Sequence, residues 1–256
     1  KFYQILAGKY TLGRSNFFGK EKALTLCSDL NTKDLVGCVT FYDGQMDEGL
    51  LGRWMFKNAK NAGVQIFEDT PIDRVSVTGE IACSRLGLKV YDYIINAAGP
   101  WAEQLNKRSG IFGDHSLDLV RGSHLVVNAD LKNPYLFQDA KGSRIVFVLP
   151  YLGKTLIGTT EVSQDLGEEI KCSNEERNYL IDIYNSNFRQ KIFSGDIISS
   201  FSGLRAIVSG RNSNLSMASR EALISTDSKL ITVLGGKWTT APSLSKKVLS
   251  KVRAIS

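Results

Sequence analysis

One segment, residues 91–105 (YDYIINAAGPWAEQL), constrains the fold more than any other part of the chain. An apolar strand runs into two small residues, Ala97 and Ala98, and Gly99-Pro100 then leads into a helix. A turn of small residues lets the backbone approach a ligand closely, and a helix N-terminus favours a negative group there. A strand–turn–helix that binds nothing has the same composition, so the segment predicts α/β structure and leaves the ligand open.

A second apolar strand ends in the loop LGGKWTT, residues 234–240. A nucleotide-triphosphate loop requires a glycine five residues before its Gly-Lys pair and a serine or threonine directly after the lysine. Ile231 and Trp238 occupy those two positions. The glycines of this loop therefore serve a different ligand or a structural purpose.

The rest of the chain alternates between helical and strand patterns. Periodic apolar residues predict helices over residues 20–29, 46–59, 173–188 and 240–253. Ser173 and Glu176 have the spacing of a capping box at the start of the third of these helices. Short apolar and β-branched runs predict strands over residues 36–43, a buried strand over 64–67, a small meander over 72–90, and β-rich segments from 117 onward. We therefore expect an α/β (α+β) fold in which an α/β region brackets a mostly antiparallel insertion.

Composition excludes several classes of protein. The 256 residues include 43% hydrophobic residues, and 32 basic against 26 acidic residues give a net charge of +6. This mild excess permits an acidic ligand or an anionic membrane surface but does not indicate nucleic acid binding. No apolar run approaches the ~20 residues that span a bilayer, and the first ten residues lack the pattern of a secretory leader. The four cysteines are scattered, which predicts reduced intracellular thiols and no metal site.

A small set of polar residues is available for chemistry. His124 lies within a predicted strand and His115 in a polar loop, where we expect it at the surface. A lone histidine in a strand is more often a hydrogen-bonded structural residue than a catalyst. Arg205 and Arg220 could each bind a ligand, but arginines more often form salt bridges at the surface. These cations, with Lys237, have the charge to bind an anion, but the sequence alone does not place them side by side.

Several segments together resemble the FAD-dependent glycerol-3-phosphate dehydrogenases of the glycine/D-amino-acid oxidase superfamily. They follow the family's order, and they read FYDGQMDEGLL, IINAAGPWAEQL, VRGSHLVV, RIVFVLPYLGKTLIGTTEV, NYLIDIYNSNF, FSGLRAIV and LGGKWTT. The combination of GSH, IGTT with a following acid, and GGKxTT distinguishes this family from its sister oxidases. The resemblance implies oxidation of sn-glycerol 3-phosphate to dihydroxyacetone phosphate, with quinone or oxygen as the electron acceptor.

The resemblance also implies roles for individual residues. His124 would act as the base, since an imidazole titrates near ~6.5, and Arg205 would be catalytic and substrate-binding. Arg220 and Lys237 would join Arg205 in one cationic cluster that His124 also lines. The expected contacts to FAD are Val75, Ala97, Gly99, Gly235, Gly236, Lys237, Trp238 and Thr239.

The resemblance divides the chain by role. Residues 1–44 and 117–225 would form the substrate-binding domain, and residues 45–116 and 226–256 would form later portions of the FAD-binding domain. The G-x-G-x-x-G unit that grips the FAD diphosphate in this family does not occur in these residues. We therefore expect the chain, as a truncated middle portion, to hold FAD weakly and to be inactive in isolation.

Two alternatives remain at this point. One is a sister flavin oxidase of an amine or a 2-hydroxy acid, and the other is a non-catalytic truncated module. We expect a cytoplasmic protein, with peripheral contact to the inner face of the cytoplasmic membrane.

Overall fold

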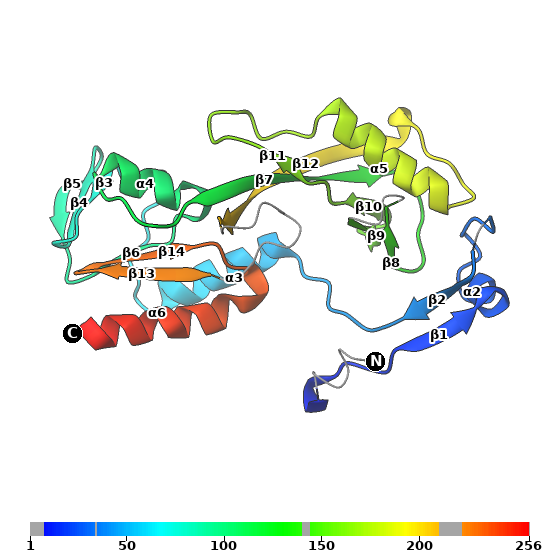
Figure 1. Cartoon of the computed structure of the whole chain (residues 1–256), viewed down its shortest axis with the longest axis horizontal. Helices are drawn as coiled ribbons and strands as arrows, with labels where there is room; N and C mark the ends of the chain where they lie inside the picture. The colour runs from blue at the N-terminus through cyan, green and yellow to red at the C-terminus, as the bar shows by residue number, and fades with distance from the viewer. Residues whose placement is uncertain (1–7, 34, 140–143, 210–221, 256) are drawn as a thin grey trace. The chain divides into compact units, whose positions relative to one another are not determined.

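The computed structural model describes residues 8–33, 35–139, 144–209 and 222–255 (Figure 1). The chain divides into two compact units. The first comprises residues 1–63, 124–158 and 173–200, and the second comprises residues 64–123, 159–172 and 201–256. Each unit is thus assembled from separate stretches of chain, and strands β7 (Leu117–Val127) and β12 (Ile197–Val208) run from one unit into the other.

The largest sheet has six strands, in the order β11-β7-β10-β9-β8, with β12 also paired to β7. The pairings β7–β10, β9–β10, β8–β9 and β7–β11 are all antiparallel. This sheet confirms the prediction of a mostly antiparallel insertion within an α/β chain. Its shorter strands are β8 (Tyr135–Gln138), β9 (Ile145–Tyr151), β10 (Lys154–Gly158) and β11 (Val162–Ser163).

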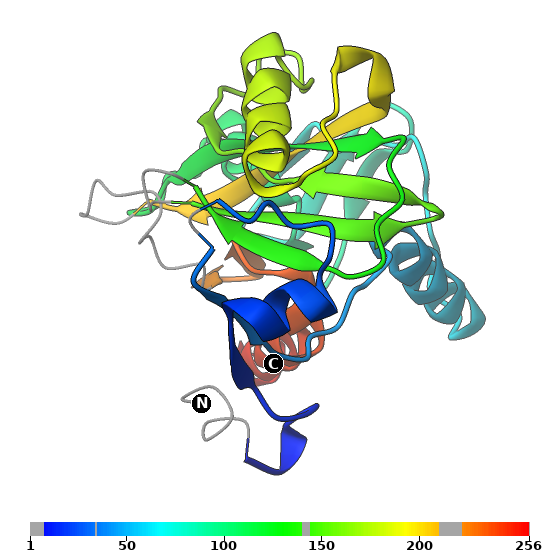
Figure 2. The same cartoon turned by 90° about the vertical axis from the view of Figure 1, so that its right-hand side faces the viewer.

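In the first unit, helix α5 (Asn174–Asn187) lies on one face of the strands β8–β10 (Figure 2). The contact is aromatic: the Phe188 ring stacks on Tyr184 at 4.4 Å between centroids and meets Tyr135 edge-on at 5.1 Å. Phe188 is 1% exposed, so this cluster anchors the end of the helix to the sheet. The unit's remaining elements are η1 (Gly8–Tyr10), β1 (Asn16–Gly19), α2 (Lys20–Leu26), β2 (Gly37–Thr40), α3 (Glu48–Asn61) and η3 (Ser194–Asp196).

Helix α5 begins with the capping box that the sequence predicts. Ser173 Oγ accepts a hydrogen bond from Glu176 N at 3.3 Å, and Glu176 Oε2 accepts one from Ser173 N at 2.9 Å. Two of the backbone N–H groups at the start of the helix thereby gain partners.

Helix α3 begins at Glu48, and Asp47 Oδ1 caps it by accepting from Leu50 N at 2.8 Å. Its apolar side chains are not buried: Leu50 is 58% exposed and Trp54 is 63% exposed. The predicted buried strand over 64–67 is wrong, because these residues form no strand and Phe67 is 54% exposed. An apolar run becomes a strand only where a neighbouring strand completes its hydrogen bonds, and none of the described residues pairs with this run.

In the second unit, helices α4 (Ala102–Arg108) and α6 (Ala241–Ile255) pack on opposite faces of a three-stranded sheet (Figure 1). Leu105 of α4 packs with Ile94 and Leu230, and Val248 of α6 packs with Ile231 and Val233. Adjacent residues 230 and 231 therefore point to opposite faces, as strand geometry requires.

The strand order in this sheet is β13-β14-β6. Its strands are β6 (Ile94–Asn96), β13 (Leu223–Asp227) and β14 (Leu230–Leu234), and the unit also contains β3 (Arg74–Val75), β4 (Glu80–Cys83), β5 (Gly87–Val90), η2 (Gly99–Trp101) and η4 (Trp238–Thr240). The meander β3–β4–β5 confirms the prediction for residues 72–90. Among the described residues, no helix is both long enough and apolar enough to cross a membrane.

The capping box provides a direct test of the first unit. Replacing Ser173 by alanine removes the acceptor for Glu176 N, so the free energy of unfolding should fall by about 1 kcal/mol. Urea denaturation followed by circular dichroism measures this difference. Ser186→Ala is the matched control, because the Ser186 hydroxyl only donates to the Asp182 carbonyl of the same exposed helix face. Equal midpoints for the two variants would contradict the capping role.

Candidate functional site

The turns that follow β6 and β14 lie at one edge of the sheet in the second unit. These two strands pair in parallel, with Ile94 opposite Leu230 and Asn96 opposite Thr232. Carboxyl ends of parallel strands share an edge, and ligands of open α/β sheets bind there. The structure therefore brings together the turn at 97–99 and the loop at 235–236. The family resemblance implies that both of these segments contact FAD.

Asn96, the last residue of β6, fixes the shape of the first turn. Its Nδ2 donates to Ala102 O at 2.9 Å and to Asn106 Oδ1 at 2.8 Å, and its Oδ1 accepts from Ala98 N at 3.2 Å. Asn106 Nδ2 in turn donates to Thr232 Oγ1 of β14 at 2.9 Å. Sequence reasoning missed this network, although a polar residue at the end of an apolar strand was a visible signal for it.

The two turns are built from glycines and other small residues, which would let a ligand approach the backbone. Gly99 has φ 56°, Gly235 has φ 72° and Gly236 has φ 97°, conformations that side-chain-bearing residues rarely adopt. A Cβ at position 236 would also lie 3.1 Å from Leu244 Cδ2. Ala97 is exposed and carries only a methyl group, so this edge fits the close approach of an extended anionic ligand.

The residues after the glycine loop lead into α6. Lys237 has an extended backbone and precedes the short helix η4, and Thr240 N donates to Lys237 O at 3.0 Å. The side chains of Lys237, Trp238 and Thr239 are exposed, and α6 then continues for 15 residues. The glycine loop thus leads directly through η4 into the N-terminus of α6, and a helix N-terminus favours an anion.

Val75 occupies a different environment. Its side chain is 6% exposed and packs with Ile94, Leu105 and Leu230 in the core of the second unit. Its backbone N–H donates to Ser109 Oγ at 2.9 Å. Any contact of Val75 with a cofactor would therefore use its backbone and not its side chain.

His124 lies on β7 directly opposite Gly158 of β10. A Cβ built on Gly158 would lie 2.1 Å from His124 Cδ2, so the imidazole ring occupies the space that a side chain at 158 would fill. His124 is half-buried as a residue, and its Nδ1 atom is buried. The histidine is thus accommodated on a strand surface by a glycine of the neighbouring strand.

Arg205, on β12, is accommodated in the same way by Gly122 of β7. A Cβ on Gly122 would lie 2.3 Å from Arg205 Nη2. The guanidinium donates from Nη2 to Thr159 Oγ1 at 2.7 Å and from Nη1 to the Thr160 carbonyl at 3.3 Å. Its Nη1 also lies 3.9 Å from Glu161 Oε1. Thr159 and Glu161 come from the IGTTE segment and were not predicted as site residues.

The proposed cationic cluster remains a prediction. Arg205 and Lys237 both belong to the second unit but lie on different elements, β12 and the loop before η4. Arg220 lies outside the described residues. Within the described residues, no group of three or more His, Cys, Asp or Glu side chains could hold a metal ion.

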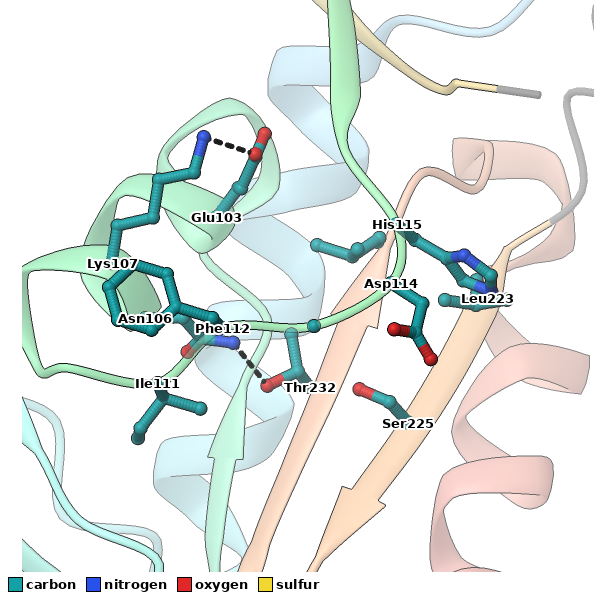
Figure 3. A pocket seen from close by; sticks show the side chains of 12 residues that line it. Glu103, Asn106, Lys107, Ile111, Phe112, Asp114, His115, Leu223, Ser225 and Thr232 are labelled. Atoms are coloured by element: carbon teal, nitrogen blue, oxygen red, sulfur yellow. Dashed lines mark hydrogen bonds and ion pairs between the residues drawn. The ribbon is translucent and has the colours of Figure 1, made fainter. Parts of the chain in front are cut away.

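A small cavity of about 90 Å³ lies beside α4 and the strands β13 and β14 (Figure 3). His115 lines it and is exposed, as expected, and Glu103 pairs with Lys107 at 2.5 Å along its wall. Among the residues that the structure describes, none of the predicted site residues lines this cavity. Its size suits a few water molecules, not a cofactor.

The contact between His124 and Gly158 can be tested by NMR. Gly158→Ala should displace the imidazole, because a methyl group cannot lie 2.1 Å from Cδ2, and should cost about 1–3 kcal/mol through overpacking. The chain has two histidines, so the ring ¹H–¹³C spectrum reports His124 almost alone, with His115 as an internal reference.

Gly203→Ala on β12 is the control, because a Cβ there would meet nothing within 4 Å. We expect the His124 ring resonances to shift in Gly158→Ala and to stay in place in Gly203→Ala. Unshifted resonances in both variants would show that the imidazole does not pack on Gly158.

Most of the chain matches a family of known proteins. Residues 2–248 match the family model described as "DAO: FAD dependent oxidoreductase". The aerobic glycerol-3-phosphate dehydrogenase of Bacillus subtilis is 29% identical over 99% of this chain and 48% of its own length. The D-erythritol 1-phosphate dehydrogenase of Brucella abortus is 32% identical over 63% of this chain and 34% of its own length.

A solved structure of glycerol-3-phosphate dehydrogenase from Bacillus halodurans, complexed with FAD, has the same fold. It superposes with a TM-score of 0.78 at 24% identity, over 92% of this chain and 48% of that one. The chain therefore spans less than half the length of these relatives.

Proposed function

Because the chain belongs to the DAO family of FAD-dependent oxidoreductases, we propose that it forms part of an enzyme that oxidises sn-glycerol 3-phosphate to dihydroxyacetone phosphate. The observation that carries this proposal is the pair of turns at the shared edge of β6 and β14. Their small residues would let a dinucleotide cofactor approach the backbone closely. The named relatives include enzymes of glycerol 3-phosphate and of D-erythritol 1-phosphate, so a polyol phosphate is the favoured substrate class.

FAD would be held in part by the turn containing Ala97 and Gly99 and by the loop containing Gly235 and Gly236. Lys237, Trp238 and Thr239 would lie at the start of the helical segment that follows, where N–H groups and the helix dipole favour negative charge. When bound, FAD supplies the hydride acceptor for oxidation of a secondary alcohol. The 256 residues contain no G-x-G-x-x-G unit, so we expect them to bind FAD weakly by themselves.

His124 is the proposed base for the substrate hydroxyl proton. An imidazole is the side chain best suited to accept a proton in this pH range, and His124 is half-buried on the strand β7. Arg205 is proposed to bind the substrate, mainly its phosphate, because a planar guanidinium matches phosphate oxygens.

Arg220 and Lys237 are proposed as further phosphate contacts. A phosphate ester carries close to two negative charges at neutral pH, and several cations would balance this charge. The electron acceptor, quinone or oxygen, and a cytoplasmic location with peripheral membrane contact remain predictions of the resemblance.

The substrate is tested by anaerobic stopped-flow measurement of flavin bleaching in the FAD-loaded, full-length gene product. We expect sn-glycerol 3-phosphate to bleach the flavin far faster than glycerol. Arg205→Ala should reduce this preference by roughly ten- to a hundredfold, the contribution of one charge-assisted hydrogen bond of about 1.5–3 kcal/mol.

Other substrates in the same assay separate the alternatives. Faster bleaching by glycine or by a 2-hydroxy acid would identify a sister oxidase, and faster bleaching by D-erythritol 1-phosphate would identify a different polyol phosphate. A full-length protein that binds no flavin would support the non-catalytic alternative.

The role of His124 is tested in the same enzyme. His124→Ala should slow flavin reduction by roughly 10²–10⁴-fold, the usual contribution of a general base, without unfolding the chain. His115→Ala removes the other histidine, which is exposed in a loop, and should leave the rate unchanged. A wild-type rate of flavin reduction in His124→Ala would rule out the proposed role.

A further inference from the structure

The guanidinium of Arg205 is held by three consecutive residues of the IGTTE segment. A hydroxyl (Thr159), a backbone carbonyl (Thr160) and a carboxylate (Glu161) each face one of its terminal nitrogens, at 2.7, 3.3 and 3.9 Å. All four residues belong to the second unit. The arginine is therefore held in a defined orientation before any ligand arrives.

The carbonyl contact is fixed by the strand framework. Thr160 is 1% exposed, and its Oγ1 accepts from Ser123 N of β7 at 2.8 Å. This bond ties the segment to the strand that carries Gly122, the residue on which the guanidinium rests. The two contacts that a side-chain substitution can alter are therefore those of Thr159 and Glu161.

These two side chains act on the guanidinium in different ways. The Thr159 hydroxyl accepts a short hydrogen bond and so sets the direction of Nη2. The Glu161 Oε1 atom lies 3.9 Å from Nη1, close enough to reduce the effective positive charge of the guanidinium. Both partners of this ion pair are about 30% exposed (31% and 27%), so the pair contributes little to stability and matters mainly through its charge.

We propose that Thr159 and Glu161 are positioning residues that set the orientation and the effective charge of Arg205, and thereby the affinity of the site for a phosphate dianion. The inference rests on the proposed function in that it takes the ligand of Arg205 to be a phosphate ester. Thr159 strengthens binding by holding the guanidinium in place. Glu161 weakens binding by opposing the charge of the ligand, which limits retention of phosphate-bearing product.

Three substitutions separate these effects. Thr159→Val removes the hydroxyl and keeps the shape, whereas Thr159→Ser keeps the hydroxyl. Glu161→Gln removes the charge and keeps the shape. Isothermal titration calorimetry of the full-length gene product, with inorganic phosphate and with sn-glycerol 3-phosphate, measures each dissociation constant without requiring turnover.

We expect Thr159→Val to raise both dissociation constants roughly tenfold and Thr159→Ser to stay within about twofold of wild type. Glu161→Gln should lower both constants by roughly three- to tenfold, and this gain should shrink in high salt. Tighter binding cannot result from a damaged fold. Thr155→Val is the matched control for Thr159→Val, because its buried hydroxyl donates to the Ala129 carbonyl and does not contact Arg205.

The outcomes distinguish the inference from the proposed function. Suppose that Arg205→Ala weakens phosphate binding. The inference is then overturned if Thr159→Val binds like wild type, or if Glu161→Gln binds no more tightly. If Arg205→Ala binds phosphate and sn-glycerol 3-phosphate like wild type, or if the wild type binds neither, then the proposed phosphate contact fails and the inference fails with it.

Discussion

The parallel pairing of β6 with β14 determines the arrangement of the second unit. Two parallel strands cannot be joined by a tight turn and need a long connection. Here residues 97–229 lie between the two strands in the chain. The pairing nevertheless aligns Asn96 with Thr232, and Asn106 bridges the two strands from α4. The buried Asn96 and Thr232 and the half-buried Asn106 are hydrogen-bonded in one network, so the strand ends and the turns beyond them take one arrangement.

Much of this architecture is visible in the sequence, because its signals are local. The capping box of Ser173 and Glu176, the meander of residues 72–90, and the glycine loop at 235–236 each depend on residues close together in the chain. The strand predicted for residues 64–67 failed for the opposite reason: its apolar residues were correctly noted, but strand formation depends on a partner elsewhere. Helix α3 shows the same contrast. Its backbone hydrogen bonds are local, so the helix forms, but burial of Leu50 and Trp54 would depend on another element, and both side chains are exposed.

The candidate site shows the same limit. Sequence comparison could nominate His124 and Arg205, but not the glycines that accommodate them, because Gly158 and Gly122 act across strand pairs. Nothing local to the IGTTE segment indicates that Thr159 and Glu161 face an arginine 46 and 44 residues later. For Val75, the sequence correctly predicted a β-strand, but it did not predict that the side chain would be buried in the core.

The opposition of His124 and Gly158 has a consequence for how this sheet can change over evolution. The two residues share one volume: the ring extends over the neighbouring strand because position 158 contributes no side-chain atoms. A larger residue at 158 and a smaller one at 124 would fill the same space from the opposite side. Wherever a histidine is kept at 124, position 158 should therefore stay glycine, because any side chain there would clash with the ring.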